Sequence, residues 1–270
     1  MKKIVVNILT AIIVCIGCGG SGDRMRMTVE GSGRVAFTLQ GSGTAIVDWG
    51  DGSDRTIRQL SSGGTSFSKT YARSGRHTIT ITGNDMIGLV VGEGLHDLDG
   101  FRHIGGELLT SLDVRRNTKL MTLTVRGTQI TNLDVSNNTA LTDLSFSNNR
   151  LTSLNVSGNT ALTRLDVTNN QLTSLNVSGN RTLTRIYASS NQLTNLNVSG
   201  NTALRSLNVQ NIQFTSSAFN ALFESLPATS GLISIRGNPG TNEVLSGTRP
   251  EPRGNARTFT TIDTDWRILN

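Results

Sequence analysis

The chain has 270 residues, of which 36% are apolar, 4% are aromatic and 29 are glycine, enough for one large or two small folded domains. Only 16% of the residues are charged, against about 25% in average proteins, which argues against a disordered chain and a long coiled coil. The net charge of +6 comes from basic residues that are mostly spread singly along the sequence. Because no basic stripe with interleaved aromatics occurs, the sequence predicts no nucleic-acid partner.

The first seventeen residues have the pattern of an export signal. Two lysines precede an apolar run that is too short to span a bilayer, and a small-residue boundary follows. The segment Cys15-Ile16-Gly17-Cys18 resembles a bacterial lipobox, in which the cysteine after a small residue is lipidated and becomes the new N-terminus. This resemblance implies a leader over residues 1–17, a lipid on Cys18 and a flexible tether over 18–25. The alternative is an ordinary cleaved signal with incidental cysteines.

Residues 26–84 alternate apolar and polar side chains with a period of two, which predicts short β-strands. Gly/Ser clusters predict turns at 31–33, 41–43 and 61–64. Within this region the segments DWGDGS (48–53) and YARSGRHTITI (71–81) resemble the PKD-like family, named after polycystic kidney disease. That family pairs a W-G-D-G-S turn with a Y-x-x-x-G-x-x-x-(I/V) strand. The resemblance implies an immunoglobulin-like β-sandwich that serves as a spacer or interaction module.

The first of these segments also contains candidate calcium ligands. Asp48, Asp51 and Asp54 are hard oxygen ligands within seven residues, and Gly50 and Gly52 would let the loop curl around an ion. The alternative is a tight turn in which the Asp51 side chain bonds its own backbone. Because the three-residue spacing departs from that of a calcium loop, we predict no metal and no cofactor, and keep the three aspartates as candidates only.

Residues 85–213 carry a 21-residue repeat. One full unit, LTRLDVTNNQLTSLNVSGNRT, extends from Leu162 to Thr182 and matches the leucine-rich-repeat template L-x-x-L-x-L-x-x-N-x-L. Since one coil cannot bury its own apolar side chains, the repeat predicts stacked coils with a continuous core, and 86–91 is expected to be a degenerate opening coil. The repeated asparagines are expected to bond turn backbone groups of their own and the next coil. They form two series: Asn149, Asn170 and Asn191, and Asn117, Asn138, Asn159, Asn180 and Asn201.

The last segment, residues 214–270, is expected to cap the final coil, because an open coil would expose its core. Ser216 or Ser217 is expected to cap a helix, and strands are expected at 232–235 and 266–269. One face of that helix is apolar: Phe219, Leu222, Phe223 and Leu226. The fold class that follows is mainly β: a small immunoglobulin-like (PKD-like) β-sandwich, then a leucine-rich-repeat solenoid with an α/β C-terminal cap.

Comparison of the repeats with one another indicates where a partner could bind. The outward positions of the second half of each coil scarcely change, whereas those of the first half vary freely. The first half resembles the parallel-strand face of leucine-rich repeats, which is the usual ligand side. Tyr and Arg are enriched at interface hot spots, which favours a protein partner; the alternative is neutral drift of a tolerant surface. The predicted partner-binding residues are Arg126, Asp143, Arg164, Asp166, Arg185 and Tyr187.

No G-x-S-x-G elbow or H-E-x-x-H motif occurs in the sequence, and no cysteine nucleophile remains after Cys18, so we predict that the chain is not an enzyme. The whole sequence resembles secreted PKD-like plus leucine-rich-repeat lipoproteins of bacteria, with internalin-type repeats. This resemblance implies an adhesion or recognition protein that is held in the outer membrane by its lipid alone, facing the cell surface or the periplasm. The alternatives are a structural scaffold or spacer of the envelope, and a glycan binder. The glycan-binding hypothesis is disfavoured because Tyr187 is the sole aromatic residue on the variable face.

Overall fold

The fold is mostly β, with one helix among the described residues, in a computed structural model of the chain. The structure describes residues 10–13, 23–83, 85–92, 111–115, 117–128, 130–228, 230–241 and 266–269. These residues form two compact units, Met1–Arg150 and Leu151–Asn270. Each unit is built around its own set of strands.

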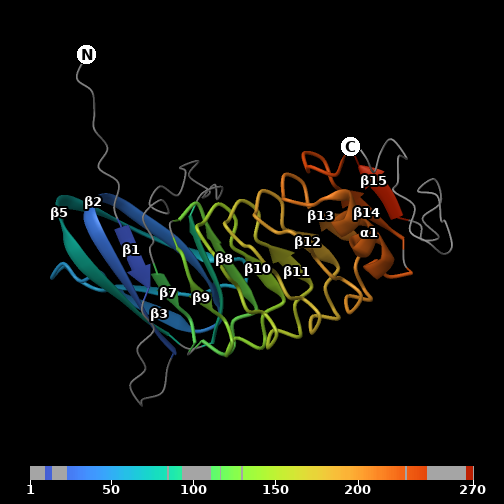
Figure 1. The fold of residues 1–270 in the computed structure, drawn as a ribbon. Helices are drawn as coiled ribbons and strands as arrows, with labels where there is room; N and C mark the ends of the chain where they lie inside the picture. The colour runs from blue at the N-terminus through green and yellow to red at the C-terminus, as the bar shows by residue number, and fades with distance from the viewer. Residues whose placement is uncertain are drawn as a thin grey trace, which may run out of the picture. The chain divides into compact units, whose positions relative to one another are not determined.

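Two long antiparallel strands dominate the first unit (Figure 1). They are β2 (Asp23–Gly41) and β5 (Thr65–Gly83), each 19 residues long. The turn that we predicted at 31–33 is wrong, because β2 runs through it with a shift of register between Gly31 and Gly33. Gly33 has a φ of 135°, so a glycine-containing bulge bends the strand there without ending it. The other two Gly/Ser clusters mark turns, as predicted: 61–64 lies between strands, and 41–43 begins at the last residue of β2.

The two long strands take different neighbours at their two ends. Strand β3 (Thr44–Asp48) pairs with the end of β5 and with β4 (Thr56–Gln59), whereas the end of β2 pairs with β6 (Met86–Gly92). The core of this region is aromatic, since the Phe37 ring centroid lies 5.4 Å from that of Phe67 and 6.0 Å from that of Trp49. All three side chains are buried.

Strand β6 also begins the repeat. It pairs in parallel with β8 (Thr122–Arg126), with Leu89 opposite Leu123, and β8 pairs in parallel with β10 (Asp143–Ser145). Residues 86–91 therefore supply a strand next to that of the first regular coil, as expected of an opening coil, and residues 93–110 lie outside the described ranges. Short strands of the other half-coil, β7 (Ser111–Asp113) and β9 (Leu133–Asp134), form a second parallel pair.

A further strand comes from the predicted leader. Strand β1 (Thr10–Ile13) is antiparallel to residues 27–30 of β2 and parallel to β7. Part of the apolar N-terminal run therefore contributes to the sheet of the first unit.

The second unit consists of repeated coils, each of which contributes one strand to a parallel sheet (Figure 1). The central residues Leu165, Ile186 and Leu207 lie opposite one another in adjacent strands and are buried, so they form one apolar row across the sheet. The 21-residue leucine-rich repeat is confirmed by this register. The strands, in spatial order, are β11 (Arg164–Asp166), β12 (Arg185–Tyr187), β13 (Ser206–Asn208), β14 (Gly231–Ser234) and β15 (Trp266–Leu269).

Each coil turns at a residue in the left-handed region of the backbone. Glycine and asparagine adopt this conformation more readily than other residues, which explains why most of these positions are Gly or Asn. Their 21-residue spacing shows that the turn is a fixed part of the repeat, which our sequence prediction did not include. They are Gly127, Asn148, Asn169, Ser190 and Asn211, with φ between 51° and 64°.

Asn149, Asn170 and Asn191 follow three of these turn residues; each is buried and bonds the backbone, as the repeat predicts. In Asn191, Oδ1 accepts the backbone N–H of Leu172 at 3.0 Å, while Nδ2 donates to the carbonyls of Val167 and Ala188 at 2.9 and 3.0 Å. Asn238 makes equivalent bonds in the last described turn, although it lies outside the 21-residue spacing.

The second asparagine series joins consecutive coils. Asn201 Nδ2 donates to the carbonyl oxygens of Val177 and Asn180, at 2.8 and 2.9 Å, and the Asn201 side chain is fully buried. Asn138 and Asn180 make the corresponding pairs of bonds to the coils before them. Both series therefore supply the hydrogen bonds that buried backbone groups of the turns would otherwise lack.

No described helix is long and apolar enough to cross a membrane. The predicted cap helix is α1 (Ser216–Ser225). Its N-cap is Thr215, whose side chain accepts the N–H of Ala218, and not the predicted Ser216 or Ser217. Phe219 and Leu222 are buried, with the Phe219 ring 5.4 Å from that of Phe214. The aromatic cluster therefore packs the helix onto the last coil.

Candidate partner-binding site

Strand alternation in the second unit sorts side chains between the core and the outer face of the sheet. In β11 the central Leu165 is buried, so Arg164 and Asp166 lie on the opposite face. The parallel register places Arg185 beside Arg164, and Tyr187 beside Asp166. Four of the six predicted partner-binding residues are therefore neighbours on two adjacent strands.

Three of these four side chains form one cluster, which we call the Arg164 cluster: Arg164, Asp166 and Tyr187. Arg164 Nη2 lies 2.9 Å from Asp166 Oδ2, and the two side chains are only 19% and 13% exposed. The Arg164 guanidinium carbon lies 5.4 Å from the centroid of the Tyr187 ring, within the range of a cation–π contact. Asp166 Oδ1 also accepts the backbone N–H of Thr168 at 3.2 Å. These contacts hold the charged groups and the ring in fixed positions.

Arg185 differs from its neighbour Arg164. It is exposed, and its row continues across the sheet to Ser206 and then to Leu232 of β14. Leu232 is 44% exposed, one of three large apolar side chains in the described part of the chain that are this open. The face beside the Arg164 cluster therefore presents an accessible cation and an accessible aliphatic side chain, separated by a serine.

The other two predicted residues, Arg126 and Asp143, belong to the first unit. Arg126 Nε donates to the hydroxyl of Ser145 at 2.9 Å, and Asp143 lies opposite Thr122 in the parallel register of β8 and β10. Not every outward position of the variable half-coil is accessible. Ser145, Ser147 and Ser189 are buried.

The uniform half-coil face is built from repeated turns. Asn155, Asn176 and Asn197 are exposed, and in each the side-chain oxygen accepts the backbone N–H two residues later, at 2.9 to 3.0 Å. Asparagine side chains commonly form such turns. A requirement of the backbone thus accounts for the constant asparagine at this position.

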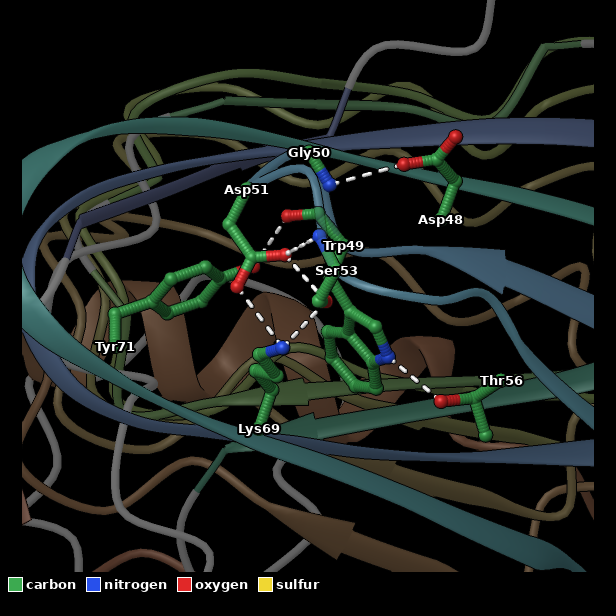
Figure 2. A network of polar contacts seen from close by, with 8 residues as sticks. All are labelled: Asp48, Trp49, Gly50, Asp51, Ser53, Thr56, Lys69 and Tyr71. Carbon is green, nitrogen blue, oxygen red and sulfur yellow. Dashed lines mark hydrogen bonds and ion pairs between the residues drawn. The ribbon is translucent and has the colours of Figure 1, made fainter.

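The DWGDGS segment of the first unit forms a network of its own (Figure 2). Asp51 accepts the backbone N–H of Ser53 at 3.1 Å and ion-pairs with Lys69 at 2.9 Å. The Tyr71 hydroxyl donates to the carbonyl of Trp49 at 2.6 Å, and Trp49 Nε1 donates to Thr56 at 2.7 Å. The two motifs that suggested the PKD-like family are therefore in direct contact.

The candidate calcium ligands have other partners in this network. Asp48 accepts the N–H of Gly50 at 3.0 Å and ion-pairs with Arg55 at 3.3 Å, while Asp51 bonds Ser53 and Lys69. Asp54 is exposed. Within the described ranges, no three His, Cys, Asp or Glu side chains are grouped so as to hold a metal ion.

Two side chains of this network have shifted pKa values. Hydrogen bonds from Ser53 and Lys69 lower the pKa of Asp51 from 3.8 to about 2. Burial raises the pKa of the Tyr71 hydroxyl, and the negative charges of Asp51 and Asp48 add to this effect. Tyr71 therefore remains a hydrogen-bond donor to Trp49 at any physiological pH.

We predict an acid-dependent contribution of Asp51 to stability. Because its folded-state pKa is depressed, the contribution is present above pH 3.8 and is lost as the pH falls towards 2. Urea unfolding of the wild type and Asp51→Asn should show a stability gap at pH 5 that closes near pH 2. Asp54→Asn, which changes an exposed carboxyl of the same loop, should show no such gap. A gap of constant size across this range would contradict the assignment.

No protein-family model and no curated protein matches the chain. Among solved structures, it is similar to the functional domain of InlJ from Listeria monocytogenes, which includes a cysteine ladder, with 27% identity, a TM-score of 0.46, and 61% of this chain and 32% of that chain covered. It is also similar to a leucine-rich-repeat protein of Leptospira interrogans, with 18% identity, a TM-score of 0.45, and 60% of this chain and 46% of that chain covered. The chain thus spans less than half the length of either solved chain.

Proposed function

We propose that the chain is a non-enzymatic binding protein of the bacterial cell envelope, which recognises a protein partner through the outer face of β11–β13. The observation that supports this most directly is the Arg164 cluster, in which an ion pair and an aromatic ring are held together on adjacent strands. Tyr and Arg contribute most often to interface hot spots. Because the cluster is already ordered in the free protein, a partner would not have to immobilise these side chains.

The domain assignments of the N-terminal half are part of the same proposal. Residues 26–84 are a PKD-like sandwich, supported by the aromatic core around Trp49 and by the hydrogen bond between Tyr71 and Trp49. It acts as a spacer between the repeats and the membrane. The anchor is a lipid on Cys18, which lies outside the described residues. Cleavage before Cys18 would remove β1 and leave its neighbours in β2 and β7 without that strand.

Lipidation can be tested by metabolic labelling with a fatty-acid probe. We expect the wild-type chain to be labelled and Cys18→Ser to be unlabelled, because only the cysteine after the small residue becomes the new N-terminus. Cys15→Ser is the matched control and should retain the label, since Cys15 would leave with the leader. Equal labelling of the wild type and Cys18→Ser would contradict the anchor. Protease treatment of intact cells would then show whether the chain faces outward.

Partner binding should depend on the Arg164 cluster. We expect the double variant Arg164→Ala/Tyr187→Ala to weaken binding of a captured partner by at least about tenfold, roughly 1.4 kcal/mol, because it removes the ring and leaves Asp166 without its cation. The measurement is the dissociation constant of a partner first identified by cross-linking to the full chain on cells.

The control is the double variant Asn155→Ala/Asn176→Ala on the uniform face, which should leave the affinity nearly unchanged. Both asparagines are exposed, and their side-chain hydrogen bonds are local to their own turns, while the backbone bridge between them is retained in alanine. If the control pair weakened binding and the first pair did not, the functional face would be the opposite one. If no partner bound to either form, the result would favour the role of a structural spacer.

A further inference from the structure

We infer that the partner is recognised through an acidic peptide segment that lies across β12, β13 and β14; this inference rests on the proposed function and specifies its ligand. The Arg164 charge is already paired with Asp166. Arg185, at the equivalent position of the next strand, is exposed, and no described carboxylate forms an ion pair with it. Arg185 is therefore the cation that this face offers to a ligand.

The charge of the surrounding surface supports an acidic partner. Residues 151–241 contain five arginines but only two carboxylates, Asp166 and Glu224. Asp166 is already held by Arg164, and Glu224 is an exposed residue of α1. An excess of one sign of charge attracts a ligand of the opposite sign and rejects ligands of the same sign.

Leu232 determines where the apolar residue of the ligand must lie. In the parallel register, Arg185 lies opposite Ser206, and Ser206 lies opposite Leu232. Adjacent strands are about 4.8 Å apart, so the Cα atoms of Arg185 and Leu232 are separated by about 10 Å. The short side chain of Ser206 between them lets a peptide backbone approach the sheet.

This separation matches one backbone conformation in particular. A polyproline II segment has three residues per turn and a rise of about 3.1 Å, so residues i and i+3 lie on the same side, about 9 Å apart. A peptide with Asp or Glu at one position and an aliphatic residue three positions away would therefore reach Arg185 and Leu232 together. The backbone C=O groups between these two positions are unpaired in this conformation and would face Ser206 and Asn208.

The experiment is a fluorescence-anisotropy titration of the full chain with labelled peptides. The probes contain Glu-Pro-Pro-Leu or Leu-Pro-Pro-Glu, and the comparison peptides replace Glu with Gln or place Glu and Leu next to each other. We expect at least one of the two probes to bind, and the comparison peptides to bind at least about fivefold more weakly than that probe. The salt dependence of the binding should show the contribution of the ion pair.

Variants locate the site on the protein. Arg185→Ala and Leu232→Ser, both at exposed positions, should each weaken the probe at least about fivefold, because each removes one of the two contacts. Arg150→Ala removes the same charge from an exposed position of the first unit and should change binding less than about twofold. Equal binding of the Glu and Gln peptides, or equal effects of Arg150→Ala and Arg185→Ala, would overturn the inference.

The two proposals fail in distinguishable ways. If the captured partner depends on Arg164 and Tyr187 while neither probe binds, the acidic-peptide inference is wrong and the proposed function stands. If the probes bind at Arg185 and Leu232 but no protein partner depends on the Arg164 cluster, the face binds peptides and the proposed partner contact is wrong.

Discussion

Leu165→Ala should destabilise the second unit by roughly 2–5 kcal/mol, because it opens a cavity in the middle of the apolar row. Leu165 is fully buried in β11 and lies opposite Ile186 of β12, so the missing methyl groups cannot be replaced by water or by movement of a surface side chain. Urea unfolding followed by far-ultraviolet circular dichroism measures the loss of unfolding free energy.

The matched control is Thr163→Ala, two residues earlier on the same coil. The Thr163 side chain is exposed, and its backbone carbonyl, which accepts the N–H of Thr184, is retained in alanine. We expect a change of less than about 0.5 kcal/mol. Similar unfolding free energies for Leu165→Ala and Thr163→Ala would contradict the inward position of Leu165.

The repeat could be predicted from the sequence because every coil must place the same residue types at the same inward positions. Once Leu165, Ile186 and Leu207 are recognised as equivalent, parallel stacking puts them opposite one another. A glycine cluster is a less specific signal than the repeat, because it does not indicate one type of backbone structure. The cluster at 31–33 suggested a turn, but a bulge within a long strand also uses glycine, and only the pairing of β2 with β5 distinguishes the two.

The start of the cap helix illustrates another limit. Thr215, Ser216 and Ser217 are consecutive hydroxyl residues, and both residue types suit an N-cap. The choice of Thr215 depends on where the chain leaves the preceding coil, and a bond from outside the helix holds that point, since the carbonyl of Phe214 accepts the N–H of Gly240 at 2.9 Å. This is a tertiary constraint that local propensity does not contain.

Within the candidate site, the alternation of side chains predicted which residues share a face but not which of them bond one another. The pair Arg164 and Asp166 could have been anticipated, since residues two apart in a strand lie on the same side. The contact of Arg164 with Tyr187 joins adjacent coils, and its geometry depends on the direction that the arginine takes. The structure thus adds what the sequence did not predict: Arg164 contacts both Asp166 and Tyr187.

Asn170→Ala should cost about 1–3 kcal/mol, because it leaves buried backbone groups without partners. Asn170 Oδ1 accepts the N–H of Leu151 at 2.9 Å, and Nδ2 donates to the carbonyls of Val167 and Thr168 at 3.0 and 3.3 Å. Alanine supplies neither the acceptor nor the donor, and the site is too buried for water to replace both easily.

Two further variants separate the hydrogen bonds from the loss of side-chain volume. Asn170→Asp keeps the shape and the acceptor for Leu151, but it removes the donor and places a carboxylate near two carbonyl oxygens. It should therefore be at least as destabilising as Asn170→Ala at pH 7. Asn155→Ala removes an exposed asparagine with one turn bond and should cost less than either. If all three variants unfolded at the same urea concentration as the wild type, the asparagine series would not be a source of stability, and the abundance of asparagine in the repeat would need another explanation.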